Sequence, residues 1–424
     1  MDDKSSQEAL IGFVPYNWQI KPLMHFLSRI TYGFTNPMPD TKAGPWKITA
    51  KDVINGSINY ETARHTCHED FESLLTSKSK PNVGDILLTK DATIGRVAVV
   101  DRENICINQS VALLQPNHEI IPYFLKYLLE SPFYQKLIEN DAHGTTIKHV
   151  YITKIDKMKI AVPPLKQQKV IVNILRSLDD KIELNRRMNQ TLEQMAQDLF
   201  NHYFVDNIDP DNLPEGWKRG RLGDYIETIS KTHKFPKPTI IFLNTSDILD
   251  GKVLNRDYGL VAELPGQAKK SIKTNDILFS EIRPANKRFA FINFDSEDYV
   301  VSTKLMVLRS KTDIDSLFFY FLLTRNETLS HLQNIAESRS GTFPQITFDQ
   351  LKEIEFNIPC DDFLKTFTNE SLQPLYQMIF NNDKEIKTLS LLRDTLLPKL
   401  MSGEIDVGAL MKKEKQQIEN LETV

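Results

Sequence analysis

The chain has 424 residues, of which 41% are hydrophobic and 25% charged, and its formal net charge is −4. Its length allows two or three domains, and no apolar run approaches the length of a membrane span. The charge argues against a surface that is basic throughout, but nucleic-acid binding needs only a local basic patch. Three scattered cysteines without a CxxC pair, and an acidic start without a signal-peptide pattern, predict a cytoplasmic protein.

The first part of the chain predicts a mixed α and β domain. Residues 1–12 are expected to form a loose arm, and a Pro-x-x-Trp pattern at Pro15 and Trp18 marks the start of the domain. A β-hairpin follows, in which the strands GDILLT and IGRVAVV flank a polar turn at residues 90–93. A third strand, INQSVALLQP, precedes a helical stretch that is broken near Pro132. The domain ends with a polar segment, HGTTIKHVY, and a last strand, DKMKIAVP.

One long helix is predicted over residues 163–205, because no helix-breaking residue follows the two prolines at its start. At 1.5 Å per residue it would be about 60 Å long, which is too long for an ordinary globular domain. Side chains on one face recur at alternating spacings of four and three, as in a coiled coil. The positions of this repeat are Ile171, Leu175, Leu178, Ile182, Asn185, Asn189, Leu192, Ala196, Leu199 and Tyr203.

After an acidic linker at residues 206–216, the same order of elements begins again. The Pro-x-x-Trp pattern returns in LPEGW, the hairpin as TNDILFS and FAFINF, the third strand as YVVSTKLMVLRS and the polar segment as SRSGTFPQITF. Equivalent landmarks lie 191 to 199 positions apart: 191 separate Asp85 from Asp276, and 197 separate Gly144 from Gly341. The pattern therefore predicts a two-fold internal repeat of a domain followed by a helix.

Residues 360–403 predict the second long helix, which Gly403 ends. Two apolar stripes on two long helices most simply bury each other as an antiparallel pair. Asn185, Asn189 and Asn382 in these stripes either fix the register of the pair, at a cost in stability, or lie at its edge and face water. The apolar residues expected in this packing are Ile171, Leu175, Leu178, Ile182, Leu192, Leu199, Leu375, Ile379, Ile386, Leu389 and Leu396.

The predicted fold class is α+β: two repeated domains separated by two long helices that pack as an antiparallel coiled coil, with pseudo-two-fold symmetry. The predicted boundaries are an arm at 1–12, a first domain at 13–162, a central helix at 163–205, a linker at 206–216, a second domain at 217–359, a C-terminal helix at 360–403 and a solvated tail at 404–424.

Motifs of common catalytic classes are absent from the sequence. It has no GxxxxGK[ST] phosphate loop, no GxGxxG, no GxSxG, and no Asp-Pro-Pro-Tyr or Asn-Pro-Pro-Tyr loop. His65 and His68 are three residues apart, but no second pair completes a zinc site. The segment DQLKEIEF offers an acid and a lysine for a nuclease, yet Leu351, Ile354 and Phe356 fit the core around a strand better.

Taken together, these pieces resemble the DNA-specificity subunit of type I restriction–modification systems, from about residue 12 to about residue 407. The resemblance is carried by NVGDILLTKDATIGRVAVV, INQSVALL, HGTTIKHV, the helix AVPPLKQQKVIVNILRSLDDKIELNRRMNQTLEQMAQDLFNHYFVD, the linker LPEGWK and the end LLRDTLLPKLMSGEI. The chain departs from the pattern at Ala92, where many relatives carry Gly in the hairpin turn, and in its extra tail after about Asp406.

The resemblance implies a non-catalytic subunit that recognises DNA. Each of two target-recognition domains would read one half of a bipartite site in double-stranded DNA. The helix pair would set the gap and dock two modification (methyltransferase) subunits, and restriction (translocase/endonuclease) subunits would complete the complex. No cofactor is expected in this chain, since S-adenosylmethionine, and ATP with Mg for restriction, would be held by the partner subunits. No membrane partner is expected.

Loops that reach a groove of DNA need hydrogen-bond donors and acceptors for bases and positive charge for phosphates. The alternative for each such residue is an ordinary solvated turn. Gly144 and Gly341 either allow a tight turn near DNA or only end a helix. The candidates for DNA contact are Lys90, Thr93, Arg96, Thr145, Thr146 and Lys148 in the first domain, and Arg283, Asn286, Lys287, Arg288, Thr342 and Gln345 in the second.

Three hypotheses for function follow. A specificity subunit would bind a specific sequence mainly together with a methyltransferase subunit. A self-contained methyltransferase or nuclease would need catalytic loops that the sequence lacks. A stand-alone sequence-specific DNA-binding regulator would bind DNA without partners, in a salt-dependent manner.

Overall fold

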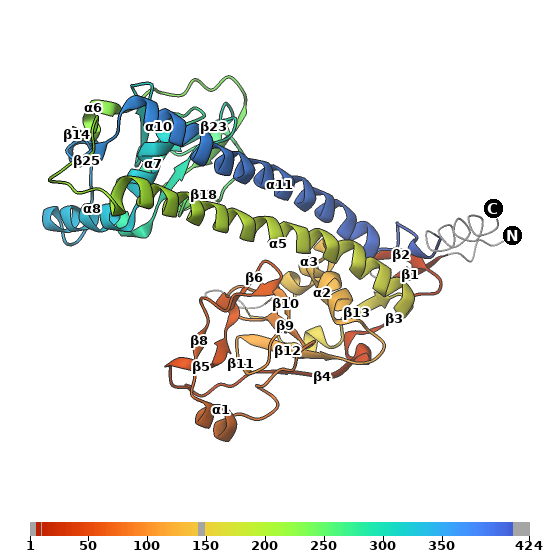
Figure 1. The fold of residues 1–424 in the computed structure, drawn as a ribbon. Helices are drawn as coiled ribbons and strands as arrows, with labels where there is room; N and C mark the ends of the chain where they lie inside the picture. Colours follow the sequence, from red (N-terminus) through yellow and green to blue (C-terminus); the bar gives the residue numbers. More distant parts are fainter. Residues whose placement is uncertain (1–5, 10, 143–148, 410–424) are drawn as a thin grey trace, which may run out of the picture. The chain divides into compact units, whose positions relative to one another are not determined.

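The computed structural model describes residues 6–9, 11–142 and 149–409, which form two compact units (Figure 1). The first unit contains the chain up to Ile182 and from Lys387 onward, and the second contains Glu183–Ile386. The two long helices, α5 (Leu165–Asn201) and α11 (Gln373–Met401), therefore contribute one segment to each unit. Within the described residues, no helix has the length and apolar content needed to cross a membrane.

The first unit is built on an antiparallel sheet in the order β10-β9-β12-β4. The predicted hairpin is confirmed as β9 (Ile86–Thr89) paired with β10 (Val97–Val99). The predicted third strand begins four residues later than expected, because Asn108 caps a turn by accepting a hydrogen bond from the backbone N–H of Ser110 at 3.1 Å. The other strands of this sheet are β4 (Leu27–Tyr32) and β12 (Val111–Pro116).

A second sheet and a closing strand pair complete the first domain. In the order β11-β5-β8, strand β11 (Ile105–Ile107) runs parallel to β5 (Thr41–Ile48), which also pairs with β8 (Arg64–His65). The strands β3 (Gln19–Pro22) and β13 (Lys159–Val162) join the start of the domain to its end. Shorter elements are β6 (Val53–Ile54), β7 (Ser57–Ile58), α1 (His68–Leu74) and α4 (Ile152–Ile155).

The predicted helical stretch is two helices, α2 (Pro122–Glu130) and α3 (Pro132–Asn140). The break falls at Ser131, as expected of the residue before a proline. Phe124, Leu125 and Leu128 of α2 are fully buried in a core shared with the sheet and with the two long helices. Within this unit α5 contributes Ile171 and Leu175 to that core, and α11 contributes Leu397, Leu400 and Met401.

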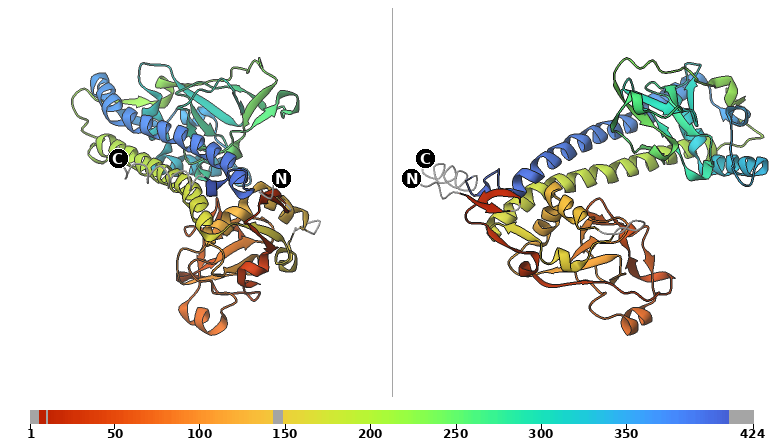
Figure 2. Two further views of the ribbon diagram at one scale, coloured as in Figure 1. Left: turned by 90° about the vertical axis from the view of Figure 1, so that its right-hand side faces the viewer. Right: turned by 180° about the vertical axis from the view of Figure 1, so that it is seen from behind.

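The second unit, seen from two further sides in Figure 2, has a strand order that repeats this topology, as the sequence predicted. Its main sheet has the order β15-β24-β21-β22, and its second sheet the order β19-β16-β23-β20, in which β16 and β23 are parallel as β5 and β11 are. The strands of the main sheet are β15 (Ile226–Thr228), β21 (Ile277–Ser280), β22 (Phe289–Phe291) and β24 (Leu305–Ser310). Those of the second sheet are β16 (Thr239–Leu243), β19 (Tyr258–Leu260), β20 (Ala268–Ser271) and β23 (Tyr299–Ser302).

Strand β14 (Lys218–Arg221) pairs with β25 (Glu355–Ile358), and this pair closes the second domain as β3 and β13 close the first. Leu351 and Phe356 are buried and Ile354 packs against the same core, so the core interpretation of DQLKEIEF is confirmed. The remaining elements are α6 (Leu222–Tyr225), β17 (Ile248–Leu249), β18 (Lys252–Val253), α7 (Ser316–Thr324), α8 (Asn326–Arg339), α9 (Phe348–Leu351) and α10 (Asp361–Phe367).

The repeat extends to single side chains at matching positions. Asp85 and Asp276 each precede the first hairpin strand and accept a backbone N–H from three residues upstream, at 2.8 and 2.7 Å. Their second partners differ: Gln115 donates to Asp85 at 3.0 Å, whereas Arg309 binds both carboxylate oxygens of Asp276 at 2.7 and 2.8 Å. The turn is therefore retained in both halves with a different donor in each.

The antiparallel packing of α5 against α11 is confirmed in each unit. Asp179 faces Arg393 in the first, while Asn185 faces Glu385 and Asn189 faces Asp383 in the second. Of the predicted apolar positions, Ile171, Leu175, Ile182, Leu192 and Ile379 are buried, and Leu178, Leu199, Leu375, Ile386, Leu389 and Leu396 are half-buried.

Two boundary predictions and one position of the predicted helical repeat are wrong. Ser6–Ala9 form β1, paired with β2 (Gly12–Pro15), so this part of the expected loose arm is a strand. Tyr203 is 42% exposed while Phe200 and Phe204 are buried, because α5 ends at Asn201 and Tyr203 lies in a π-helical turn that interrupts the repeat. The expected tail begins inside the fold, since Val407 is buried in the core of the first unit.

Both long helical regions contain a π-helical turn, at His202–Asp206 after α5 and at Thr368–Leu372 between α10 and α11. The predicted second helix is thus confirmed as a helical region with one local insertion. Its end is also as predicted, because Gly403 follows α11 at a φ of +73°.

Candidate nucleic-acid interface

In the first domain, the hairpin loop between β9 and β10 is held by Thr89 at the end of β9. The Thr89 hydroxyl donates to the carbonyl of Thr93 and accepts the backbone N–H of Arg96 at 2.9 Å. Ala92, at the tip, has a φ of +62°, the left-handed region that glycine tolerates best. The conformation of this turn therefore explains why a glycine would suit this position.

Side chains of this loop differ in how free they are to contact DNA. Lys90 is 16% exposed in its side chain and pairs with Asp91 at 3.1 Å. The hydroxyl of Thr93 donates a long hydrogen bond to the carbonyl of Ala50, at 3.4 Å. Arg96 is exposed and donates weakly to the carbonyl of Val53 at 3.3 Å. Of these three predicted residues, Arg96 is therefore the best placed for a partner.

The structure brings the hairpin loop next to the end of the polar segment. The backbone N–H of Val150 donates to the carbonyl of Lys90 at 2.9 Å, and Asp91 and His149 form a β-bridge. Thr145, Thr146 and Lys148, together with Gly144, lie outside the described residues.

In the second domain, the corresponding loop between β21 and β22 is strained. A short 3₁₀ turn, Pro284–Asn286, is flanked by Arg283 and Lys287, whose φ values of +43° and +53° are both left-handed. Such a conformation costs a non-glycine residue about 1 kcal/mol or more. Strain of this kind is found preferentially where a loop must present its side chains in one arrangement.

This loop is anchored to the second polar segment by backbone contacts. The N–H of Arg283 donates to the carbonyl of Pro344 at 3.2 Å, and Ile282 and Gln345 form a β-bridge. The N–H of Ile346 donates to the carbonyl of Glu281 at 2.9 Å. The two stretches predicted to contact DNA, around Arg283 and around Thr342, therefore form one surface.

Six predicted residues of the second domain separate into two groups. Arg283, Asn286 and Thr342 have exposed side chains, and Gln345 is half-buried. Arg288 instead donates to the carbonyls of Ser246 and Ile248, at 3.1 and 2.9 Å. Lys287 lies 3.8 Å from Asp250. Arg288 and Lys287 thus tie the loop to the neighbouring hairpin, a role that their sequence context did not reveal.

Sequence reasoning missed a basic segment, residues 231–237, whose first three residues pair with β20. The N–H of Ser271 donates to the carbonyl of Lys231 at 2.9 Å, and the N–H of His233 donates to that of Lys269 at 2.7 Å. The signal for this surface was the run KTHKFPK in the sequence, but its pairing with β20 was not visible there. The exposed lysines of this surface are Lys231, Lys234, Lys237, Lys269 and Lys273.

Two of its groups are committed to local contacts. Lys237 donates to Asp298 at 2.6 Å, and this hydrogen bond holds the pKa of the Asp298 carboxyl below its usual range. Lys270 is half-buried, donates to the carbonyls of Thr303 and Leu305, and has its pKa lowered by burial. The remaining lysines offer the positive charge that phosphates require.

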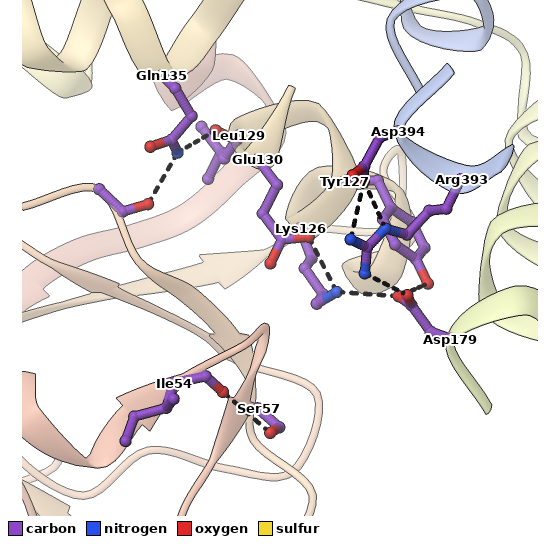
Figure 3. Close-up of polar contacts among 11 residues, drawn as sticks. Ile54, Ser57, Lys126, Tyr127, Leu129, Glu130, Gln135, Asp179, Arg393 and Asp394 are labelled. Atoms are coloured by element: carbon purple, nitrogen blue, oxygen red, sulfur yellow. Dashed lines mark hydrogen bonds and ion pairs between the residues drawn. The ribbon is translucent and has the colours of Figure 1, made fainter. Parts of the chain in front are cut away.

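In each domain the tip of a short hairpin meets a helix of that domain, α2 in the first and α7 in the second, next to a side chain of α5. In the first unit, a Cβ on Gly56 between β6 and β7 would lie 2.8 Å from Nζ of Lys126 and 2.9 Å from Oε1 of Glu130. Lys126 binds Glu130 at 3.0 Å and lies 3.6 Å from Asp179 of α5, which also accepts from Arg393 of α11 at 3.1 Å (Figure 3). Burial raises the pKa of Glu130.

The second unit has the same contact with different chemistry. A Cβ on Gly251, between β17 and β18, would lie 2.9 Å from the hydroxyl of Tyr320 and 3.8 Å from Oε1 of Glu193 on α5. Glu193 lines a cavity of about 370 Å³, and burial raises its pKa to about 7. The N–H of Asp250 donates to the carbonyl of Lys287 at 2.7 Å, so this hairpin tip joins the anchored loop to the helix.

Comparison with known proteins agrees with this architecture. The family model of the type I restriction modification DNA specificity domain matches the chain twice, over residues 34–194 and 214–379. The specificity subunit of the type I restriction enzyme MjaIX from Methanocaldococcus jannaschii is 26% identical, over 95% of this chain and 97% of the relative. That of HindI from Haemophilus influenzae is 43% identical over 182 residues, 42% of this chain and 38% of the relative.

A solved structure shares the fold. The crystal structure of the S subunit of a type I restriction-modification system from M. genitalium aligns with a TM-score of 0.57 at 18% identity, over 91% of this chain and 96% of that chain. Because the DNA-specificity domain is matched in both halves of the sequence and accounts for both repeated domains, the chain belongs to the family of type I restriction–modification specificity subunits, which recognise DNA and are not themselves catalytic.

Proposed function

We propose that this chain reads a bipartite site in double-stranded DNA, one half with each domain, on behalf of a type I restriction–modification complex. The observation that carries the proposal is that both domains present the same pair of joined segments at the same place in one topology: the loop after β9 or β21, and the polar segment before β13 or β25. Two readers of one architecture suit a site with two halves, and linking them raises the effective concentration of the second reader.

Within the second domain we assign different roles to the two basic surfaces. Arg283, Asn286 and Thr342 have exposed donors and acceptors on an anchored loop, as base readout requires. Four lysines of the basic surface carry exposed charge on flexible side chains, which suits phosphates better than bases: Lys231, Lys234, Lys269 and Lys273. In the first domain, Arg96 matches Arg288, since both precede the second hairpin strand and donate to a carbonyl of the neighbouring hairpin. Arg96 is nevertheless exposed, and we assign it a phosphate contact.

The long helices would set the gap between the half-sites and dock two modification subunits, with restriction subunits completing the complex. S-adenosylmethionine, and ATP with Mg for restriction, would then be held by those partners. Since such a complex acts on the DNA of the cell, we expect it in the cytoplasm. The support for these roles is family membership together with the antiparallel packing of α5 and α11 in each unit.

The test is to reconstitute the chain with its modification subunits and to map methylated positions in DNA at single-base resolution. We expect two short sequences separated by a fixed gap. Replacing residues 217–359 with the second domain of another specificity subunit should change one half-site only. Methylation without sequence preference, or a change in both half-sites after the exchange, would contradict the proposal.

A point variant sharpens this test within one loop. Arg283→Ala should weaken binding to the full site by about 5- to 100-fold, the range for one lost base contact. Arg288→Ala serves as the matched control, because its side chain binds the carbonyls of Ser246 and Ile248. We expect it to lower the unfolding temperature instead. The assignment of roles fails if Arg288→Ala lowers affinity without changing stability while Arg283→Ala does neither.

A further inference from the structure

Phe343 is an exposed aromatic residue on the two joined segments of the second domain, the loop around Arg283 and the segment around Thr342, here called the anchored loop pair. Its side chain is 52% exposed, although both apolar neighbours that follow it in the loop, Pro344 and Ile346, are buried. The sequence analysis assigned roles to Thr342 and Gln345 in this segment but none to the aromatic residue between them.

The backbone on both sides of Phe343 is fixed. The N–H of Phe343 donates to the hydroxyl of Ser340 at 3.1 Å. The carbonyl of Thr342 lies 3.5 Å from Nη2 of Arg283, and the carbonyl of Pro344 accepts the N–H of Arg283 at 3.2 Å. The ring is thus held outward by a loop whose own geometry is fixed, and it would lose little conformational freedom on binding a partner.

The surroundings of the ring suit nucleic acid. Arg283, with its left-handed backbone, and Arg339, at the end of α8, are both exposed beside the segment that carries Phe343. Asn286 and Thr342 add exposed hydrogen-bonding groups. Aromatic rings set among basic and amide side chains can pack against bases, because every base offers an apolar face and thymine adds a methyl group.

Resting on the proposed function, we infer that Phe343 is a specificity-determining residue whose ring makes an apolar contact with a base of the half-site read by the second domain. Arg283 and Asn286 would supply the polar contacts around it. The strain stored at Arg283 and Lys287 is then explained as the means of holding Arg283 and Phe343 together on one rigid surface.

The experiment measures binding of the full chain, in complex with its modification subunits, to two duplexes. One carries the complete site, and the other has the second half-site randomised. Phe343→Ala should weaken binding to the complete site by about 5- to 100-fold and leave binding to the randomised duplex unchanged. Phe343→Leu, which keeps an apolar side chain, should recover part of the loss. Leu254→Ala is the control, because Leu254 is 54% exposed in the same unit but outside the loop pair.

The outcomes separate this inference from the function on which it rests. If the wild-type complex does not distinguish the two duplexes, the proposed function fails. If the wild type distinguishes them and Phe343→Ala binds both as the wild type does, or loses affinity equally for both, the role of Phe343 is overturned. A loss confined to the complete site, absent in Leu254→Ala, supports it.

Discussion

Asn189 and Asn382 are hydrogen-bonded to each other between α5 and α11, with 2.9 Å between Oδ1 of Asn189 and Nδ2 of Asn382. Asn189 also donates to Asp383 at 2.9 Å, and Asn185 donates to Glu385 at 2.8 Å. Asn185 and Asn189 are buried, so of the two alternatives left open by the sequence, the solvated edge is excluded for them. Because these bonds form in only one alignment of the helices, they favour a role in fixing the register.

Removing this network should destabilise the second unit. Asn189→Ala leaves the amide of Asn382 and the carboxyl of Asp383 without a partner in a half-buried position, which typically costs about 1–3 kcal/mol. Urea unfolding measures the change. Asn381→Ala is the control, because Asn381 is exposed on the neighbouring position of α11 and should change stability by less than about 0.5 kcal/mol. Equal changes in the free energy of unfolding for the two variants would show that the hydrogen-bond network does not stabilise the second unit.

The left-handed turn at Ala92 makes a prediction about side-chain shape. Ala92→Val should destabilise the first domain by about 1–2 kcal/mol, because a β-branched residue is strongly disfavoured at a φ of +62°. Ala92→Gly should not destabilise it, since glycine adopts this conformation freely. Thermal unfolding distinguishes these variants. Ala262→Val, at another exposed site but outside the left-handed region, controls for the added methyl groups and should be close to neutral.

Gly251 and Gly341 offer a matched pair of glycine substitutions. Gly251→Ala places a Cβ 2.9 Å from the hydroxyl of Tyr320 at a φ of +82°, so we expect a loss of about 1–3 kcal/mol in urea unfolding. Gly341 has open space around its Cβ position and is absent from the left-handed region. Gly341→Ala should therefore leave stability almost unchanged.

The same variant decides between the two interpretations of Gly341. Helix α8 ends at Arg339, two residues earlier, and nothing within the domain needs a glycine at this position. If Gly341 allows close approach to DNA, Gly341→Ala should weaken binding to the complete site at unchanged stability. Unchanged binding would reject the close approach to DNA, and Gly341 would then only mark the end of helix α8.

Local sequence patterns predict much of this architecture, but they do not predict which side chains contact each other. The hairpins, the helix break at Pro132 and the pairing of the long helices follow from periodicity and turn residues. The partners of individual side chains do not: Arg288 and Arg283 share one basic loop, yet Arg288 points to carbonyls of a neighbouring hairpin 40 and more residues away. Likewise, the run at residues 231–237 became a surface only through its pairing with β20.

The carboxyl of Glu193 predicts that the stability of the second unit depends on pH. Burial raises its folded-state pKa to about 7, well above the ordinary value of a glutamate carboxyl, despite the positive charge of Lys252. Asp250 and Asp383 act in the same direction as burial. The unfolded chain therefore releases this proton at lower pH than the folded chain does. As a result, protonated Glu193 favours the folded state at low pH. The free energy of unfolding then falls as pH rises from about 4.5 to about 7, by at most about 3 kcal/mol.

Glu193→Gln should remove this loss. We expect the variant to match the wild type near pH 5 and to be more stable near pH 8, as measured by urea unfolding across this range. Glu370→Gln is the control, because Glu370 is exposed in the same unit, and its pH profile should follow that of the wild type. A wild-type profile that is retained in Glu193→Gln would assign the effect to other groups.

The role of the long helices as a spacer is testable by changing their length at the boundary between the two units, after Ile182 in α5 and after Ile386 in α11. One heptad added to each helix keeps the pairs within each unit intact, such as Asn185 with Glu385 and Asp179 with Arg393. Each insertion adds about 10 Å, the rise of about three base pairs. Methylation mapping should then show a longer gap between unchanged half-sites.

An insertion in only one helix is the control, because it shifts one set of partners against the other and should abolish binding to the bipartite site. If the double insertion altered the half-sites themselves, the helices would take part in reading bases. The described contacts argue against that result: the side chains at the centre of the pair, Asn185, Asn189 and Asp383, are engaged between the helices. The exposed donors that suit bases lie instead on the anchored loops of the domains.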